Sequence, residues 1–316
     1  MIISTCPLRV SFAGGSTDLQ DFVDQNGYGS VINCSINLKT YITLHRDVVG
    51  FSSSLHRYIV NYSVREEVED FNDIKNDLVR ECFKEFNVGP YACSLTSDIF
   101  SSGSGLASSS SYLVGLIKAV AYEKKMIASN FDVCRKSMVI ERRFNPLVGY
   151  QDPFGCGLGG VNRLHIREPN IVEQEPIQTD IFNKMDMYLI HTKLNRESTQ
   201  LLKNIDKNKT VHLLPLVNAM QEAMLKSDVS LFSKIVNEGW ERKKESNPLI
   251  TKKRQIELMD ESLSGNAEIL SHRLCGAGNG GFFLVFAKPG YDISKLNFNR
   301  ITPISVSHRG VECCEV

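Results

Sequence analysis

Hydrophobic and polar residues alternate along the first part of the chain in the way that a half-buried β-strand requires. Successive side chains of a strand point to opposite faces, so one buried face gives a period of two. This pattern, together with β-branched and aromatic residues, predicts strands over 2–6, 8–13, 58–62 and around Tyr41 and Thr43. A β-sheet is therefore expected to open the fold.

Helical periodicity replaces this alternation in the middle of the chain. Apolar residues recur every three or four positions over 74–86, 108–125 and 131–143, which places them on one face of a helix. Asn145 and Pro146 end the last of these segments, because a proline disfavours the helical conformation of the residue before it. We expect these helices to cover the opening sheet.

The second half of the chain is predicted to be rich in helices, over 199–205, 212–226 and 231–242. Strands are predicted over 185–191, 282–286 and 304–307, and the unbroken apolar run of 282–286 is typical of a strand buried on both faces. A stretch rich in proline and charge, 167–175, separates the two halves. We therefore expect two domains, 1–175 and 176–316.

Composition narrows the class of protein. The 316 residues are enough for two domains. Since 36 basic residues balance 36 acidic ones, the chain lacks the net positive charge that would attract a nucleic acid. The start has no basic segment followed by a long apolar run, and no window is apolar enough to cross a membrane, so we expect a cytoplasmic protein without a membrane partner. Nine cysteines without a Cys-x-x-Cys pair indicate reduced thiols.

Three segments rich in glycine and serine, 7–15, 102–111 and 273–281, carry the candidate chemistry. The middle segment runs directly into an apolar helix, so free backbone N–H groups and the positive end of the helix dipole meet there. It lacks the Gly-Lys-Ser/Thr of a Walker A loop and the spacing of a nucleophile elbow. A flexible linker is the alternative, which the apolar helix disfavours, and the segment predicts a phosphate site.

Two other motifs are misleading. The run 276–281 satisfies the Gly-x-Gly-x-x-Gly pattern of dinucleotide-binding proteins, but a strand follows it where that fold requires a helix. His45-Arg46-Asp47 resembles the catalytic loop of protein kinases, but Ser52 stands where the metal-binding Asn is required. We interpret the second motif as an exposed strand end.

Two carboxylates lie between the second and third segments. Phosphoryl transfer needs a cation on the phosphate oxygens, an acceptor hydroxyl and usually a carboxylate that takes its proton. Glu141 lies near the end of a predicted helix, and Asp152 follows in a turn flanked by glycines. One carboxylate can hold Mg²⁺ with a hydroxyl of Ser108 or Ser109 while the other faces the substrate. The residues alone are equally compatible with two surface carboxylates.

The order of these motifs resembles the GHMP kinase superfamily, which is named for galactokinase, homoserine kinase, mevalonate kinase and phosphomevalonate kinase. The resemblance spans nearly the whole chain. The segments 14–19, 149–152 and 274–278, with Arg196 after a strand, are most similar to the D-glycero-D-manno-heptose 7-phosphate kinases and the L-fucose kinases. The resemblance implies an α+β fold of two domains. The N-terminal domain would be like domain 2 of ribosomal protein S5, and the C-terminal domain would be ferredoxin-like.

The resemblance also implies a role for each motif residue. The residues that it assigns to the ATP phosphates are Gly103, Ser104, Gly105, Leu106, Ala107, Ser108, Ser109 and Ser110. Asp152 would be the base, Arg9 would steady it and the transferring group, and Glu141 with Ser109 (or Ser108) would ligate Mg²⁺. The residues that it assigns to the substrate are Gly14, Gly15, Ser16, Thr17, Asp18, Arg196, Gly276, Ala277 and Gly278.

The implied activity is the ATP- and Mg²⁺-dependent phosphorylation of the anomeric hydroxyl of a heptose 7-phosphate or a related sugar, which would feed nucleotide-sugar synthesis for surface polysaccharide. Ala107, Ser16, Asn279 and Arg273 depart from residues common in the family, and Ser16 and Asn279 leave the identity of the sugar open. Alternatives are a kinase of the mevalonate or homoserine type, or a GHMP-fold binding protein without catalysis. Self-association as a homodimer is left open.

Overall fold

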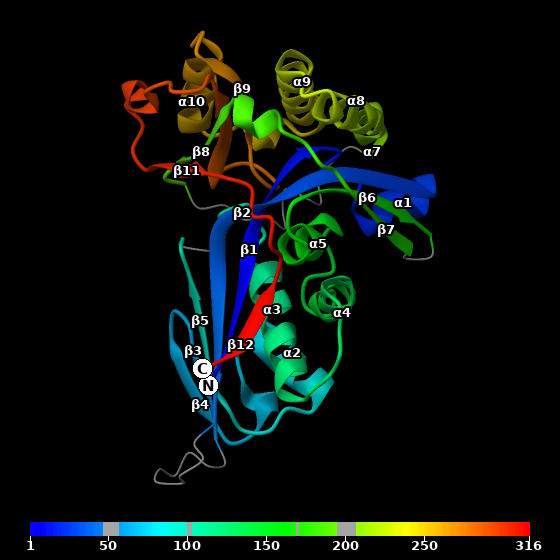
Figure 1. The fold of residues 1–316 in the computed structure, drawn as a ribbon, viewed down its shortest axis with the longest axis vertical. Coiled ribbons are helices and arrows are strands. Elements are labelled where there is room, and N and C mark those ends of the chain that lie inside the picture. The colour runs from blue at the N-terminus through cyan, green and yellow to red at the C-terminus, as the bar shows by residue number, and fades with distance from the viewer. Residues whose placement is uncertain (47–56, 100–102, 169–170, 195–206) are drawn as a thin grey trace.

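The computed structural model describes residues 1–46, 57–99, 103–168, 171–194 and 207–316. Its helices and strands form two bodies, each built on one β-sheet, with the long strands β1 (Ile2–Ala13) and β2 (Tyr28–His45) running from the lower body into the upper one (Figure 1). The mixed α+β architecture with two sheets confirms the fold class that the sequence predicted.

The first sheet is organised around β2. This strand pairs with β1 on one side, and on the other side its 28–34 part pairs with β6 and its 40–45 part with β5. The other strands of the eight-stranded sheet are β3 (Tyr58–Asn61), β4 (Arg65–Val68), β5 (Ala92–Ser97), β6 (Val161–Arg167), β7 (Ile171–Pro176) and β12 (Glu312–Glu315). All the pairings are antiparallel except that of β3 with β5.

The first strand is longer than expected, because β1 continues through Pro7 where the sequence predicted two strands. The register shifts between Pro7 and Leu8, and on its other edge β1 pairs with β12 only over 2–5. Pro7 therefore lies at an irregularity beyond the end of that neighbour, where the missing N–H group leaves no ladder hydrogen bond unmade.

Helices α2 (Asp77–Phe86), α3 (Ser108–Glu123), α4 (Asn130–Glu141) and α5 (Gln151–Gly157) lie together on one face of this sheet (Figure 1). Side chains fix two of their starts: Asn76 accepts from the N–H of Val79, and Ser129 forms a capping box. These helices confirm the three that periodicity predicted. The turn expected around Asp152 is instead α5, which tolerates Pro153 because that residue lies in the first turn.

The second sheet has the order β11-β8-β10-β9 and is antiparallel throughout. Its strands are β8 (Asp186–His191), β9 (Ile269–Leu274), β10 (Phe282–Ala287) and β11 (Ile301–Ile304). The described helices of this part are α7 (Lys207–Thr210), α8 (Leu214–Leu225), α9 (Val229–Ser246) and α10 (Arg254–Ser264). Helix α1 (Gln20–Asn26) lies in the first half of the chain, directly after the segment 14–19. The predicted helix 199–205 lies outside the described residues, and the strand predicted over 304–307 ends at Ile304 instead.

Strand β10 is buried on both faces, as its unbroken apolar run predicted. Leu284 and Phe286 join a core that includes residues of β1, β2, α8 and α9, whereas Phe283 and Val285 pack with Trp240 and residues of α10. In the first core, the ring of Phe286 lies 5.0 Å from that of Phe232 and 6.0 Å from that of Phe12. This core therefore joins the two sheets.

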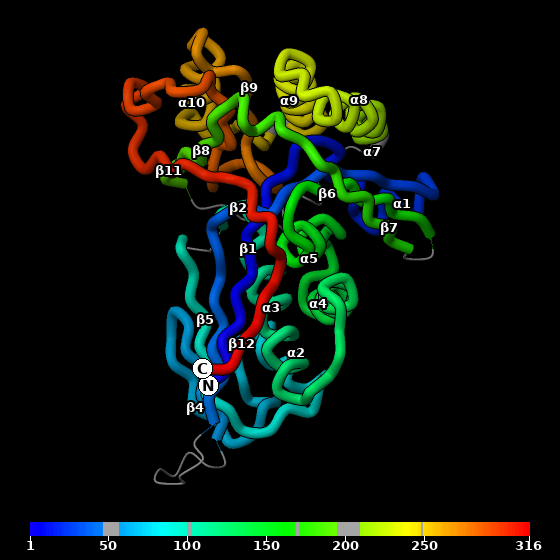
Figure 2. The backbone as a smooth tube through the Cα atoms, in the orientation of Figure 1, coloured from blue at the N-terminus to red at the C-terminus, as the bar shows by residue number. Residues whose placement is uncertain are grey.

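The chain returns to its start, because β12 lies beside β1 and the two termini are adjacent (Figure 2). The N-terminal ammonium donates to the carbonyl of Val316 over 2.9 Å. The division into 1–175 and 176–316 stays a prediction; strand β7 of the first sheet ends at Pro176. Within the described ranges, no helix is both long enough and apolar enough to cross a membrane.

Candidate active site

The serine- and glycine-rich loop before α3 has the backbone conformation of an anion site. Gly103, Gly105 and Ala107 have φ values of 68°, 83° and 61°, so left-handed residues alternate with others along the loop. Such alternation turns successive N–H groups toward one concave surface, here at the N-terminus of a helix of 16 residues. The loop can therefore hold phosphate groups, and its role in binding ATP stays a prediction.

Ala107 is the residue at which this loop departs from the family pattern. It caps α3 in the left-handed region without a side-chain hydrogen bond. A Cβ in this conformation costs about 1–2 kcal/mol relative to glycine. The packing around the loop maintains this conformation, since the guanidinium of Arg9 donates to the carbonyl of Gly105 over 2.8 Å and its backbone N–H donates to that of Leu106 over 3.1 Å.

The serine hydroxyls of the loop face different partners. Ser108 shares a hydrogen bond of 3.1 Å with Ser104, and Ser109 is exposed. Ser110 donates to Glu141 Oε2 over 2.6 Å. The hydroxyl of Ser110 thus bonds to this carboxylate, although the sequence predicted Ser109 (or Ser108) as the partner of Glu141.

Glu141 is a buried carboxylate that suits a cation. It is 1 % exposed and forms no ion pair with a lysine or arginine of the described residues. Burial raises its pKa to about 7, a rise that the Asp152 charge supports and the Ser110, Ser109 and Asn145 hydrogen bonds oppose. A cation would remove this penalty.

The donor set around Glu141 fits Mg²⁺. The part of the chain that the structure describes has no group of three or more His, Cys, Asp or Glu side chains placed for a metal ion. Mg²⁺ does not need one, because it is commonly held by one or two carboxylates together with phosphate oxygens and water. Glu141 with the hydroxyls of Ser109 and Ser110 would supply the protein's share of such a site.

Arg9 and Asp152 form an ion pair beside the loop. Asp152 Oδ1 accepts from Arg9 Nε over 3.1 Å and from Nη2 over 2.5 Å, and the two side chains are 5 % and 24 % exposed. Burial is the largest single influence on the pKa of Arg9 and lowers it, but the charge of Asp152 and its hydrogen bonds, with smaller contributions from Cys156 and Cys275, together outweigh burial and raise the pKa. The guanidinium therefore stays charged and fixes one oxygen of the carboxylate, while no hydrogen bond from the described residues reaches Oδ2.

Asp18 lies behind this pair as a second buried acid. Its Oδ2 accepts from the backbone N–H of Gln151 over 2.9 Å, and its Oδ1 accepts from Gln151 Nε2 over 3.0 Å and from the N–H of Ser16 over 3.1 Å. Burial, with the nearby charge of Asp152, raises its pKa to about 6. Gly149 permits this arrangement, since a Cβ there would lie 2.2 Å from Asp18 Oδ2.

A cavity of about 110 Å³ joins these groups. Its lining includes both acids and Arg9, residues of the first and third glycine segments, and the two cations Lys243 and Arg273. The cavity thus has carboxylates, which accept hydrogen bonds from hydroxyl groups, and cations, which attract an anion. It lies beside the loop that can hold phosphates, because Arg9 lines the cavity and also donates to Gly105 of the loop.

Known proteins are similar to this chain in sequence and in fold. No family model matches the chain. It is 26 % identical over 305 residues to a curated D-glycero-alpha-D-manno-heptose 7-phosphate kinase of Campylobacter jejuni, which covers 90 % of this chain and 88 % of that protein. The fold of this chain matches that of a D-glycero-D-manno-heptose 1-phosphate kinase from Bacteroides thetaiotaomicron with a TM-score of 0.76 at 21 % identity. The match covers 100 % of this chain and 99 % of that one. A Streptococcus pneumoniae phosphomevalonate kinase matches with a TM-score of 0.76 at 12 % identity, covering 96 % of this chain and 99 % of that one.

These similarities support the resemblance to the GHMP kinase superfamily that the motifs indicated. The chain is a small-molecule kinase, and its kinase relatives imply ATP as the phosphate donor. The solved structures, at these identities, establish the fold alone.

The substrate residues that the sequence predicted are divided between the lining of the cavity and positions outside it. Gly15, Ser16, Asp18, Gly276 and Ala277 line the cavity. Gly14, Thr17 and Gly278 do not line it, and Arg196 lies outside the described residues. Their roles in binding stay predictions.

The residues outside the cavity have structural contacts that explain their positions. Thr17 is fully buried, and its hydroxyl donates to the carbonyls of Gly14 and Ser30. Gly278 lies against Ile250, whose Cγ2 would be 2.6 Å from an added Cβ. Asn279, which interrupts the glycine run, has a φ of 58° that asparagine tolerates better than most residues, and it does not line the cavity.

Sequence reasoning missed five polar residues of the cavity: Ser11, Asn145, Gln151, Lys243 and Arg273. Ser11, Gln151 and Arg273 lie inside the motif segments, where their neighbours carry the predicted roles, and Arg273 stands at a position where the family more often has lysine. Lys243 lies on α9, beyond the end of the helix predicted over 231–242, and it donates to the carbonyl of Gly276. No local pattern marks Lys243, because its place depends on how α9 packs.

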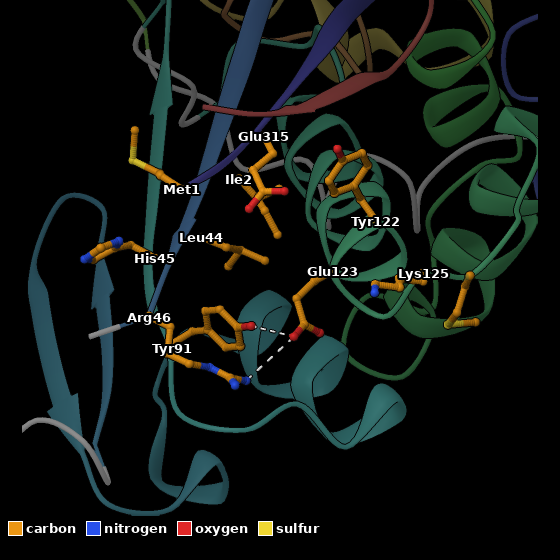
Figure 3. A pocket seen from close by; sticks show the side chains of 11 residues that line it. Met1, Ile2, Leu44, His45, Arg46, Tyr91, Tyr122, Glu123, Lys125 and Glu315 are labelled. Atoms are coloured by element: carbon orange, nitrogen blue, oxygen red, sulfur yellow. Dashed lines mark hydrogen bonds and ion pairs between the residues drawn. The ribbon is translucent and has the colours of Figure 1, made fainter. Parts of the chain in front are cut away.

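A larger cavity, of about 730 Å³, lies at the other end of α3, away from the loop. Figure 3 shows Arg46, Tyr91 and Glu123 inside it: Tyr91 donates to Glu123 Oε1 over 2.6 Å, and Arg46 lies 3.7 Å from the same oxygen. His45 and Arg46 are exposed at the end of β2, as the interpretation of the kinase-like motif required, whereas Asp47 lies outside the described residues. This cavity shares no residue with the candidate active site.

Proposed function

We propose that the protein is a cytoplasmic, ATP- and Mg²⁺-dependent sugar kinase that phosphorylates the anomeric hydroxyl of a heptose 7-phosphate or a related sugar. The observation that carries this proposal is the Arg9–Asp152 pair, which lies beside buried Asp18 in a cavity next to the phosphate-binding loop. Similarity to a heptose 7-phosphate kinase supports the choice of sugar. The product would feed nucleotide-sugar synthesis for surface polysaccharide.

The loop would bind ATP through its backbone. Its N–H groups, together with the N-terminal end of α3, would neutralise the phosphate oxygens. Glu141 with Ser109 and Ser110 would hold Mg²⁺, which supplies neutralisation of the charge on the transferring group when it is bound. Since most of the barrier in phosphoryl transfer is lowered by positioning and electrostatics, this placement would account for much of the rate.

Asp152 would take the proton from the acceptor hydroxyl. Arg9 holds its Oδ1 by two hydrogen bonds, which leaves Oδ2 to face the substrate. The guanidinium would also steady the transferring phosphoryl group, because it donates through Nη1 to the loop carbonyl of Gly105. Asp18 would accept hydrogen bonds from other hydroxyls of the sugar and thereby set which hydroxyl approaches Asp152.

The test is ATP consumption with Mg²⁺ across heptose 7-phosphates, free heptoses, fucose, mannose, galactose, homoserine and mevalonate. Phosphorus NMR of the product would identify the phosphorylated position. An anomeric phosphate on a heptose or another sugar is the expected result. Turnover of mevalonate or homoserine alone would overturn the sugar assignment.

A further inference from the structure

Three polar atoms surround a small space above Gly15. A methyl group added to this glycine would lie 3.7 Å from Ser11 Oγ, 3.8 Å from Arg273 Nη2 and 3.8 Å from Gln151 Nε2. These groups come from β1, β9 and α5, so the tertiary structure brings them together. The absence of a side chain at Gly15 leaves this space open within the cavity of the candidate active site.

Arg273 gives this space a positive charge. It is 7 % exposed, and its Nη1 donates to the carbonyl of Phe12 over 3.0 Å. It forms no ion pair with a carboxylate among the described residues, and burial together with the charge of Arg9 lowers its pKa. A buried guanidinium without a counter-charge is costly, and an anion in the space would relieve that cost.

The hydroxyl of Ser11 is independent evidence that this space takes a ligand. Its hydroxyl oxygen is buried and has no hydrogen-bond partner. Native proteins rarely leave such a group unsatisfied unless a ligand or water completes it. Lys243 lines the same cavity, so a second cation lies near the space.

The two acids complete the arrangement. Asp18 and Asp152 are acceptors, which suit the hydroxyl groups of a sugar, whereas Ser11, Arg273 and Gln151 present donors. We propose that Ser11, Gly15, Gln151 and Arg273 form a subsite for a second anionic group of the acceptor, a phosphate ester. The enzyme would then select a sugar phosphate over the free sugar. This inference rests on the proposed function, which leaves open whether the sugar carries a phosphate.

The sharpest perturbation is Gly15→Ala. Gly15 does not have a positive φ, and the added methyl would make only ordinary contacts, so the fold is expected to tolerate it. The methyl would nevertheless occupy the space that the phosphate needs. Gly89→Ala is the matched control, because its methyl would also lie 3.8 Å from an arginine Nη2, that of Arg46, far from the active site.

Ser11→Ala is a second variant that separates binding from folding. It removes a hydroxyl that has no partner in the protein, so it breaks no internal hydrogen bond. A hydrogen bond to a charged group is commonly worth about a tenfold change in affinity or more. We therefore expect the KM for the sugar phosphate to rise about tenfold in Ser11→Ala, and more in Gly15→Ala.

The measurement is kcat/KM for a heptose 7-phosphate and for the same heptose without its phosphate. We expect the wild type and Gly89→Ala to prefer the phosphorylated sugar, and Gly15→Ala and Ser11→Ala to lose much of that preference through KM. An equal fall for both acceptors would overturn the inference, because the subsite would then contact the sugar or the transferring phosphoryl group. A wild type without any preference would overturn it as well.

Failure of the proposed function is distinguishable from failure of this inference. Binding of inorganic phosphate can be measured by calorimetry with saturating ADP, which occupies the nucleotide site. Weaker binding to Gly15→Ala than to wild type and Gly89→Ala would support the subsite even if no sugar in the panel were phosphorylated. Equal binding to all three proteins would overturn the subsite.

Discussion

Replacing Asp152 by asparagine tests the central assignment, because it removes one charge and almost no volume. The amide oxygen can still accept from Arg9, so the pair loses its charge but keeps its geometry. Hydrogen bonds to charged groups contribute about 1.5–3 kcal/mol. At about 2 °C per kcal/mol for a chain of this size, the melting temperature is expected to fall by roughly 3–6 °C. The variant should therefore fold.

Catalysis should suffer far more than stability in Asp152→Asn. Loss of a general base commonly reduces the rate by about 10²- to 10⁴-fold, and we expect kcat to fall within that range. The loop that would hold the nucleotide keeps its contact between Arg9 Nη1 and Gly105, so the affinity for ADP should stay within about threefold. A coupled assay of ADP release gives kcat, and calorimetry gives the affinity.

Glu123→Gln is the matched control for this variant. Its side chain is 24 % exposed, as is that of Asp152, and it also lies beside an arginine, but at the far end of α3. Its kcat should stay close to wild type. Near-wild-type turnover of Asp152→Asn would refute the base assignment, and a loss of ADP binding in proportion to the loss of turnover would indicate a structural role.

Three further predictions concern other parts of the molecule. Burial raises the pKa of Glu141 from 4.5 to about 7, so ionisation of this carboxyl destabilises the ligand-free protein as the pH rises from 4.5 to 7. In thermal melts, Glu141→Gln should therefore melt at a higher temperature than wild type at pH 8 but not at pH 4. The variant should also lose the stabilisation that Mg²⁺ with ADP gives the wild type. Burial would raise the pKa of Asp260, but hydrogen bonds from a histidine, a lysine and a tryptophan lower it to about 2. Asp260→Asn should therefore lose about 2 kcal/mol of unfolding free energy at pH 7. Denaturant titrations should show that the difference between variant and wild type shrinks as the pH falls from 4 to 2. Gly281 has a φ of 85°, and Gly281→Ala would place a Cβ 2.4 Å from the carbonyl oxygen of Ser104, so the KM for ATP should rise at least tenfold. Gly290→Ala is the control, because Gly290 is also left-handed but has open space around it. In the same kinetic and melting assays, this control should lose only stability.

Much of the candidate site could be predicted because its motifs are local. The phosphate loop is encoded within a few residues, since glycines permit the left-handed conformations and the apolar residues that follow define the helix. The order of the glycine segments was enough to indicate the superfamily. Asp152 and Arg9, expected to act together, do form an ion pair.

Other features were hidden because burial on two faces removes periodicity. Residues 29–36 of β2 are all buried, including the polar Ser30, Asn33 and Ser35, so no alternation marked them. Alternation was visible only near Tyr41 and Thr43, where one face of β2 is partly exposed. The seven-residue helix α5 was also missed, because its glycines and proline indicate a turn and only packing makes it a helix.

By itself, the sequence determined the elements with clear periodicity, the conformation of the glycine- and serine-rich loop before α3 and the class of chemistry. Each of these depends on backbone preferences and on motifs of residues close together in the chain. Only the tertiary structure decided that Ser110 bonds to Glu141 and that Ser11, Gln151 and Arg273 surround Gly15. Such contacts depend on strand register and on the rotation of each docked helix. A shift of one residue in either would turn these side chains to another face.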